Sequence, residues 1–393
     1  MAKTGIKITT TDTVLGKPID VNTTSMLVGS LDVFSDEASL GDGDAISGRS
    51  FDELVQKGLA ANSSFAGFVK AYFSTDGGVD VTGNLVWVAQ VSNPLDLKEA
   101  VRATTVKSFD ERPRQIAFTL SSLEIQHIST ALHDLANEGI RCVAIKSEWL
   151  TDDDLNLSLA VENMKISSRV VYPFVALNVM AYSNNGDEEL GVEHMVGAAI
   201  AARDLATISV GTSIGDGGRT PMQQLAWIPL HSDMEDATEL FNVKSLTQSE
   251  LDDLGEAQVL FTRPRPPRNG LWWNDGATRN DPANALSTLE ACRTICAMAD
   301  DLQSFFVPYI NTRVPVTNTG DIQSAYKQVV LDNARAAVVQ KYIENGDISD
   351  ARINLVAKDN DMIGTRTWEV TLSILPAPTL RWIDGYVFYV KSL

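Results

Sequence analysis

Residues 261–282, FTRPRPPRNGLWWNDGATRNDP, combine side chains that can bind anions with side chains that can stack on planar groups. These side chains are Arg263, Arg265, Arg268, Trp272, Trp273 and Arg279. Guanidinium groups pair with carboxylates and phosphates through parallel hydrogen bonds. Positive charge beside aromatic rings is also typical of proteins that bind single-stranded nucleic acid.

The charge of the whole chain decides between these partners. The protein has 32 Lys and Arg residues against 51 Asp and Glu residues, which gives a formal net charge of −19. A nucleic-acid interface needs a wide basic surface, which this composition does not supply. We therefore expect no nucleic-acid partner. The arginines should pair with carboxylates of the protein or of a neighbouring copy, and the tryptophans should pack.

Two other segments resemble ligand sites without meeting their requirements. Residues 211–220, GTSIGDGGRT, are rich in glycine but lack both the phosphate-loop order with its lysine and the G-x-G-x-x-G order, so they predict a surface turn. Residues 42–48, DGDAISG, resemble the start of a calcium loop, but Ile46 and Arg49 interrupt the series of oxygen ligands. The aspartates at 152–154 suit the first turn of a helix, where carboxylates favour the helix dipole.

The serine, histidine and cysteine residues do not form a recognisable catalytic or metal-binding pattern either. No G-x-S-x-G elbow and no ordered set of serine, histidine and acid occurs. The cysteines Cys142, Cys292 and Cys296 and four scattered histidines lack metal-ligand spacing. We expect reduced structural thiols and no catalytic residue, cofactor or metal. A soluble α/β enzyme or small-molecule binding protein without a recognisable motif stays open as the alternative.

The elements that carry these residues alternate between strand and helix patterns. Buried-strand patterns at 24–31, 84–91, 114–120 and 140–146 are separated by helix patterns, including one over 123–139 with Ser121 and Ser122 as candidate caps and one over 192–206. This order predicts layered α/β structure with mostly parallel strands. After residue 230 we expect a strand at 257–263, helices at 282–305 and 321–345, and closing strands.

The last residues form an apolar strand pattern that nothing in the chain is expected to cover. Trp382, Tyr386, Phe388 and Val390 recur with a period of two after Pro376 and Pro378. Such a strand is prone to aggregate when its edge stays open, and pairing with a neighbouring subunit removes the hazard. The N-terminal segment with Ile6 and Ile8 is a second candidate for such an exchange. The sequence has no long apolar run and no signal-peptide core, so we expect no membrane insertion and a cytoplasm-like compartment.

The C-terminal half resembles the contractile tail sheath proteins of bacteriophages and related contractile injection systems. The segment GLWWNDGATRNDP followed by ANALSTLEACRTICAMADDL resembles the strand, turn and helix of that family. The segment YIENGDISDARINLVAKDN, with TRTWEVTLSILPAPTLRWIDGYVFYV, resembles its closing β segment. The chain departs from the family in its Trp-Trp-Asn-Asp-Gly turn.

The resemblance implies a mixed α/β and α+β fold: an N-terminal exchange arm (1–24), a layered α/β domain (25–230), a sheath core of helices and strands (231–375) and a C-terminal exchange arm (376–393). It implies homo-hexameric rings that stack around a tail tube and contract to drive it through a cell envelope, without nucleotide hydrolysis. The partners would be the tube, baseplate and tail terminator proteins, in a virion tail assembled in the host cytoplasm. One of the two late helices would face the tube. We favour the helix at 321–345, whose Lys327, Arg335 and Lys341 could meet an acidic tube surface; a packed helix with a solvated face is the alternative.

Overall fold

The computed structural model describes residues 24–75, 78–107, 111–119, 123–147, 175–178, 197–215, 227–229, 240–242, 247–265, 268–278 and 286–377. The expected exchange arms fall almost wholly outside this part of the chain. The arm residues Ile6, Ile8, Trp382, Tyr386, Phe388 and Val390 lie outside the described residues, as does Arg279.

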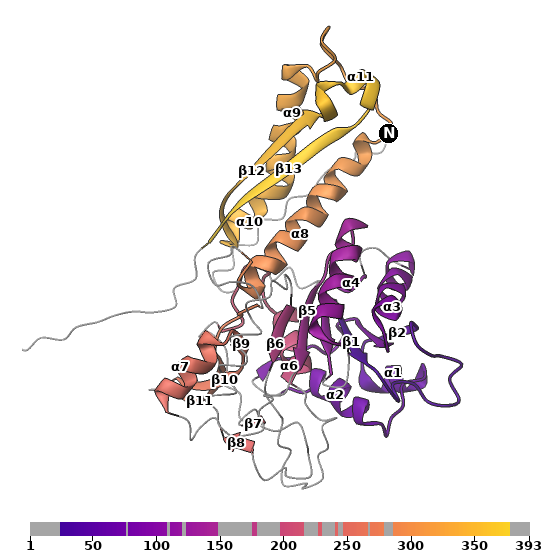
Figure 1. The fold of residues 1–393 in the computed structure, drawn as a ribbon, viewed down its shortest axis with the longest axis vertical. Helices are drawn as coiled ribbons and strands as arrows, with labels where there is room; N and C mark the ends of the chain where they lie inside the picture. The colour runs from indigo at the N-terminus through magenta and orange to yellow at the C-terminus, as the bar shows by residue number, and fades with distance from the viewer. Residues whose placement is uncertain are drawn as a thin grey trace, which may run out of the picture.

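A seven-stranded sheet forms the centre of the α/β body (Figure 1). Its order is β2-β3-β1-β4-β5-β6-β9, and every pairing is parallel except that of β2 with β3. The strands are β1 (Ser25–Gly29), β2 (Ala45–Gly48), β3 (Val86–Gln90), β4 (Gln115–Phe118), β5 (Val143–Ser147), β6 (Val175–Asn178) and β9 (Val259–Leu260). The predicted strand–helix alternation and mostly parallel sheet are confirmed.

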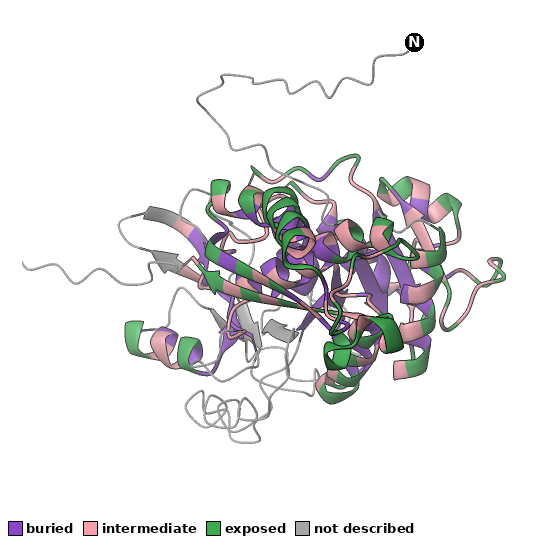
Figure 2. Cartoon of the chain, turned by 90° about the horizontal axis from the view of Figure 1, so that it is seen from above, coloured by how far each residue is buried: buried purple, intermediate pink, exposed green. Residues whose placement is uncertain are grey.

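Helices cover both faces of this sheet, which explains why its strands read as continuous apolar runs. Met26 and Val28 of β1 point to one face and Leu27 to the other, following the two-residue repeat of a strand. The first face carries α3 (Pro94–Lys107) and α4 (Ile125–Asn137); the second carries α2 (Ser64–Tyr72) and α6 (Gly197–Ala206). The buried residues accordingly gather in the interior, between the helices (Figure 2). The remaining helices of the body are α1 (Phe51–Gln56) and α7 (Gln248–Glu256) among the described residues.

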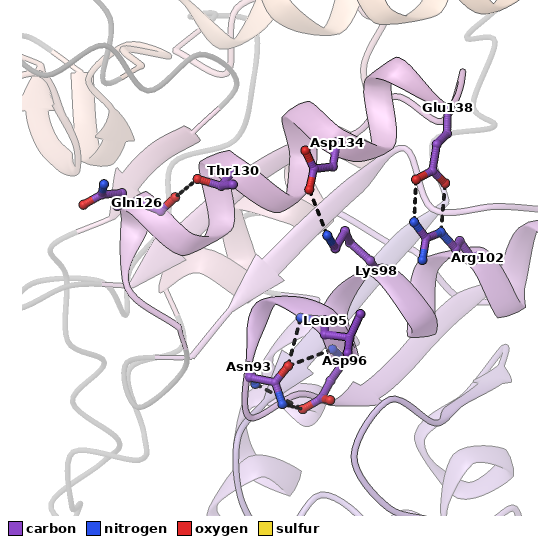
Figure 3. Close-up of polar contacts among 9 residues, drawn as sticks. All are labelled: Asn93, Leu95, Asp96, Lys98, Arg102, Gln126, Thr130, Asp134 and Glu138. Carbon is purple, nitrogen blue, oxygen red and sulfur yellow. Dashed lines mark hydrogen bonds and ion pairs between the residues drawn. The ribbon is translucent and has the colours of Figure 1, made fainter.

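The outer surfaces of α3 and α4 are tied by two ion pairs (Figure 3). Lys98 Nζ lies 2.8 Å from Asp134 Oδ2, and Arg102 pairs with both carboxylate oxygens of Glu138. Solvent screens these exposed pairs, so they contribute little to stability.

The start of α4 differs from the expectation. Ser121 and Ser122, the expected caps, lie outside the described residues; the N-cap is Glu124, whose side chain makes no capping bond. Leu123, which is 8% exposed, packs in the core before the helix begins, so the chain stays non-helical up to Glu124. The predicted end is confirmed, because Gly139 adopts a left-handed φ of 84°.

A second unit follows, built from two long helices and a β-hairpin (Figure 1). Its elements are α8 (Leu289–Phe306), the 3₁₀ turn η5 (Val307–Tyr309), α9 (Ser324–Ala334), the π-helical turn η6 (Arg335–Val339), α10 (Gln340–Glu344), β12 (Ile348–Ala357), η7 (Lys358–Asn360), α11 (Met362–Thr365) and β13 (Trp368–Pro376). The pairs β7 (Trp227–Pro229) with β8 (Leu240–Asn242) and β10 (Thr262–Arg265) with β11 (Arg268–Trp273) are antiparallel.

The first long helix begins later than its expected start at residue 282. The main-chain N–H of Leu289 donates to the Gly276 carbonyl, and Ala277 forms a β-bridge with Thr288. These contacts hold Thr288 outside the helix, and its side chain then caps the helix by accepting from the Ala291 N–H. No described helix is long and apolar enough to cross a membrane.

Core packing generates the first prediction. Phe118 of β4 is fully buried on the α3/α4 face, so Phe118→Ala should lower the free energy of unfolding by about 3–5 kcal/mol. Val106, which is 87% exposed on α3, offers a control: Val106→Ala should change it by less than about 0.5 kcal/mol. Urea unfolding of both variants checks this, and equal midpoints would contradict the assigned core.

Candidate assembly surfaces

The arginine- and tryptophan-rich segment forms the β10–β11 hairpin. Trp273 is buried, and its indole Nε1 donates to Asp204 Oδ2 at 2.7 Å. Arg263 pairs with Asp252 of α7 at 3.3 Å. Trp272 is also buried. Arg265 is part of strand β10, and Arg268 is part of strand β11. The described side chains of this hairpin thus contact the protein itself.

Asp204 connects this hairpin to α6 and the sheet. The Nε and Nη2 atoms of Arg203 donate to Asp204 Oδ1 at 2.9 and 2.8 Å, and both side chains are buried. Arg203 Nη1 also donates to the carbonyl of Ser74, after α2. A buried charge is stable only when it is paired and hydrogen-bonded, so these contacts fix the position of the hairpin on the body.

Helix α8 carries a second set of buried charges. Asp300 pairs with Arg112, which is fully buried, and with Arg141 Nη1 at 3.2 Å. Both arginines lie just before a strand, Arg112 before β4 and Arg141 before β5. One carboxylate on α8 therefore holds the amino-terminal edge of the parallel sheet.

Two turns earlier on α8, Arg293 holds the end of α6. Its Nη2 atom donates to the carbonyls of Leu205 at 2.7 Å and Ile208 at 3.1 Å. The last carbonyls of a helix have no partner within the helix, and a cation there also complements the helix dipole. The body and the second unit are therefore joined at two places on one helix face.

The glycine-rich segment supplies a third joint, where a surface turn was expected. In its described part, 211–215, the Gly211 N–H donates to Asp347 Oδ1 at 3.1 Å, and the Ser209 hydroxyl donates to the same oxygen at 2.6 Å. A side chain at Gly211 would collide with the backbone of Asp347. Glycine at this position permits close packing against the start of β12.

Two of the three basic residues predicted to face a tube pair with carboxylates of the same chain. Arg335 donates from Nη2 to Asp350 Oδ1 and from Nη1 to the Ala351 carbonyl, each at 2.8 Å. Lys341 turns to α8, where its Nζ lies 2.6 Å from Asp301 Oδ2. Lys327 is half-buried and makes no ion pair with another described residue. Sequence reasoning missed Asp301 and Asp350, because pairing across elements leaves no local signal.

The β12–β13 hairpin is unevenly covered by the helices it packs on. Towards the helices, β12 places Ala351, Leu355 and Ala357, which are all buried. The corresponding residues of β13 are only half-buried, and they are Trp368, Val370, Leu372 and Ile374. Trp368 also belongs to an aromatic cluster with Phe306, Tyr309 and Tyr326. Apolar area is therefore left open along β13.

All three cysteines are buried and form no disulfide; Cys292 and Cys296 lie on α8, and Cys142 lies just before β5. Cys142 donates to the Pro113 carbonyl at 3.1 Å, and burial raises its pKa to about 12. Burial also raises the pKa of Cys296. Both groups stay as neutral thiols near neutral pH, which makes them unsuited to nucleophilic chemistry.

Comparison with known proteins finds solved structures with a similar fold. No family model matches the chain, and no curated protein matches it. A solved structure of the PVC sheath complex of an extracellular contractile injection system, in the contracted state, contains a chain that aligns with a TM-score of 0.62 and 11% identity, over 99% of this chain and 98% of that one. A chain of the anti-feeding prophage baseplate aligns with a TM-score of 0.58 and 10% identity, over 99% of both chains. The resemblance to contractile injection systems therefore extends to the fold of nearly the whole chain.

The buried joint generates the second prediction. Arg112→Met leaves the buried Asp300 paired with the partly exposed Arg141, so the free energy of unfolding should fall by about 3 kcal/mol. The partly exposed Arg102 on α3 is the matched control, and Arg102→Met should cost about 1 kcal/mol or less. Denaturant titration of both variants measures the difference, and similar losses would show that the Arg112–Asp300 pair is not a buried joint.

Proposed function

We propose that this chain is the structural subunit of a contractile sheath. The observation that carries the proposal is the agreement of fold with a sheath-complex chain over nearly the full length of both chains. A match over one α/β layer would be weak support, because such layers serve many functions. Here the alignment includes the second unit with its two long helices and hairpin.

In this proposal six copies form a ring around a tail tube, and rings stack into a sleeve that shortens to drive the tube through a target envelope. The energy comes from the difference between two packings of the same subunits, so no nucleotide is hydrolysed. The partners are further copies, the tube protein, and the baseplate and tail terminator proteins. The particle is a phage tail or a related injection system, assembled in the host cytoplasm; in a phage the contraction precedes genome ejection.

The terminal segments connect copies in this proposal. Residues 1–24, with Ile6 and Ile8, and residues 376–393, with Trp382, Tyr386, Phe388 and Val390, would add strands to neighbouring subunits. The buried joints of Asp300, Arg293 and Asp347 support this division, because they oppose movement between the body and the second unit. The movements during contraction would then occur in the segments outside the joints.

Lys327 is the remaining candidate for a contact with an acidic tube. Arg335 and Lys341 already pair with carboxylates of the same chain, so their charge is partly compensated. Lys327→Glu should weaken co-sedimentation with the tube protein of the same particle at least about threefold, by repulsion between like charges. Lys70→Glu, at an exposed position on α2, should leave it unchanged. Equal tube binding by both variants would remove Lys327 from the tube surface.

The sheath proposal itself is tested by electron microscopy of concentrated full-length protein, with tube protein added. Wild-type protein should form rings or hollow sleeves. Protein lacking residues 380–393, or carrying Trp382→Asp with Phe388→Asp, should remain folded by circular dichroism but fail to form sleeves. Sleeves formed normally by both variants would refute the role of the C-terminal arm, and a wild-type protein that never forms them with its tube would refute the sheath itself.

A further inference from the structure

We infer that two surfaces at opposite ends of this chain bind each other between copies. The first is the tip of the second unit, which we define as residues 305–314 and 358–368. The second is the carboxyl edge of the sheet at β1, β2 and β3, which we define as residues 30–44 and 92–99. The place of this contact in a sleeve rests on the proposed function, whereas the match between the two surfaces does not.

The tip exposes apolar side chains around an aromatic cluster. The ring centroids of Phe306, Tyr309 and Trp368 lie 5.7–6.0 Å apart, and Met362 packs on the same cluster. Three aliphatic side chains in the segments that carry these residues are more than half exposed, and they are Val307, Ile310 and Ile363. A group of exposed apolar and aromatic side chains is typical of a surface that binds another protein.

The tip also carries cations without a carboxylate partner. Arg313, Lys358 and Arg366 are exposed, and none of them forms an ion pair with another residue that the structure describes. The acidic residues of the same segments are Asp359 and Asp361, and Asp361 accepts main-chain N–H groups of α11. In a chain of net charge −19, these exposed cations favour an acidic partner.

The carboxyl edge exposes apolar side chains as well. Leu31, soon after the end of β1, is 70% exposed, and Leu95 in the first turn of α3 is 54% exposed. The Ser92 hydroxyl donates to the Ser30 carbonyl at 3.3 Å, so the segments that carry the two leucines lie side by side. Both leucines therefore belong to one surface.

The charge of this edge is opposite to that of the tip cations. The exposed acidic residues of the edge are Asp32, Asp36, Glu37, Asp42, Asp44 and Glu99. A β-carbon at Gly43 would lie 3.3 Å from Glu99 Oε2, so the loop before β2 adjoins α3. No Lys or Arg occurs in residues 24–48, and Lys98 of α3 is already paired with Asp134. The exposed edge is therefore acidic.

A tip cannot reach the carboxyl edge of its own chain. Asp300 fixes α8 to the amino edge of the sheet. Helix α8 carries the tip away from the body, so that α11 lies at the top of Figure 1 and β1 and β2 lie in its lower half. The five residues of β1 separate the two edges of the sheet by about 16 Å. The complementary surface must therefore come from a second copy.

Binding between different surfaces of identical copies has a direction. Each copy offers one tip and one edge, so the contact is heterologous and builds a ring or a helical row. Residues 25–285 contain 37 acidic and 19 basic residues, whereas residues 286–377 contain 11 acidic and 8 basic residues. A contact between the second unit of one copy and the body of the next therefore avoids the stronger repulsion between two bodies.

Charge exchange in the full-length protein tests the inference, with the dissociation constant of self-association measured by sedimentation velocity over a concentration series. The tip variant carries Arg313→Glu, Lys358→Glu and Arg366→Glu. The edge variant carries Asp42→Lys, Asp44→Lys and Glu99→Lys. Each variant alone should associate at least about tenfold more weakly than wild type, because like charges then face one another.

An equimolar mixture of the two variants should regain association to within about threefold of wild type, because the acidic tip of one variant then meets the basic edge of the other. The edge variant reduces the net charge from −19 to −13, so overall repulsion alone would make it associate more strongly. The matched control for the tip variant changes three exposed lysines of the body, with Lys57→Glu, Lys70→Glu and Lys107→Glu. It should weaken association less than about threefold.

Wild-type association by either variant alone, or no recovery in the mixture, would overturn the inference. The sheath proposal would survive that result, because the terminal segments would still connect copies. A wild-type protein that stays monomeric up to about 500 µM would also overturn the inference. Recovery in the mixture by a protein that never forms sleeves with its tube would support the contact and refute only the sheath.

Discussion

The buried carboxylate of Asp300 fixes how the two units of the described chain are joined. A charge in the protein interior costs several kcal/mol unless partners compensate it, so Asp300 must meet Arg112 and Arg141 in the folded protein. Arg293 lies seven residues earlier on α8, on the same helix face and roughly 10 Å away along the axis. Arg293 donates to the last carbonyls of α6. Sliding or rotating α8 would therefore leave buried charged groups without their partners at two places. Apolar packing alone would penalise such a shift far less sharply.

This joint depends in turn on the parallel sheet. Parallel strands place all their amino ends at one edge, which is why Arg112 before β4 and Arg141 before β5 can converge on one carboxylate. The carboxyl edge of such a sheet is where α/β proteins commonly bind ligands. In this chain the ion pairs of Asp300 occur at the opposite edge and attach the second unit to the body.

The sequence allowed the α/β body to be predicted because its signals are local. The apolar runs that include Leu27 and Val88, the stop at Gly139 and the small-residue pattern of α6 are all visible within one element. The joints are different. Arg293 and Asp300 in a helix read as part of a solvated face, and only tertiary packing makes them buried. The same limit explains the surface turn expected at Gly211. It also explains why the pairing of Arg335 with Asp350 was missed, because that carboxylate lies in another element. The late start of α8 also depends on a remote contact, between Leu289 and Gly276.

Net charge adds a constraint on how copies of this chain can associate. At −19, identical subunits repel one another, so contacts between them need attraction that does not rely on opposite overall charge. Strand addition provides main-chain hydrogen bonds and apolar burial, and neither depends on the sign of the side chains. An edge that accepts any strand would, however, also promote aggregation of so apolar a tail. Contacts between copies of so acidic a chain must therefore offset the repulsion with main-chain hydrogen bonds and apolar burial confined to a defined geometry.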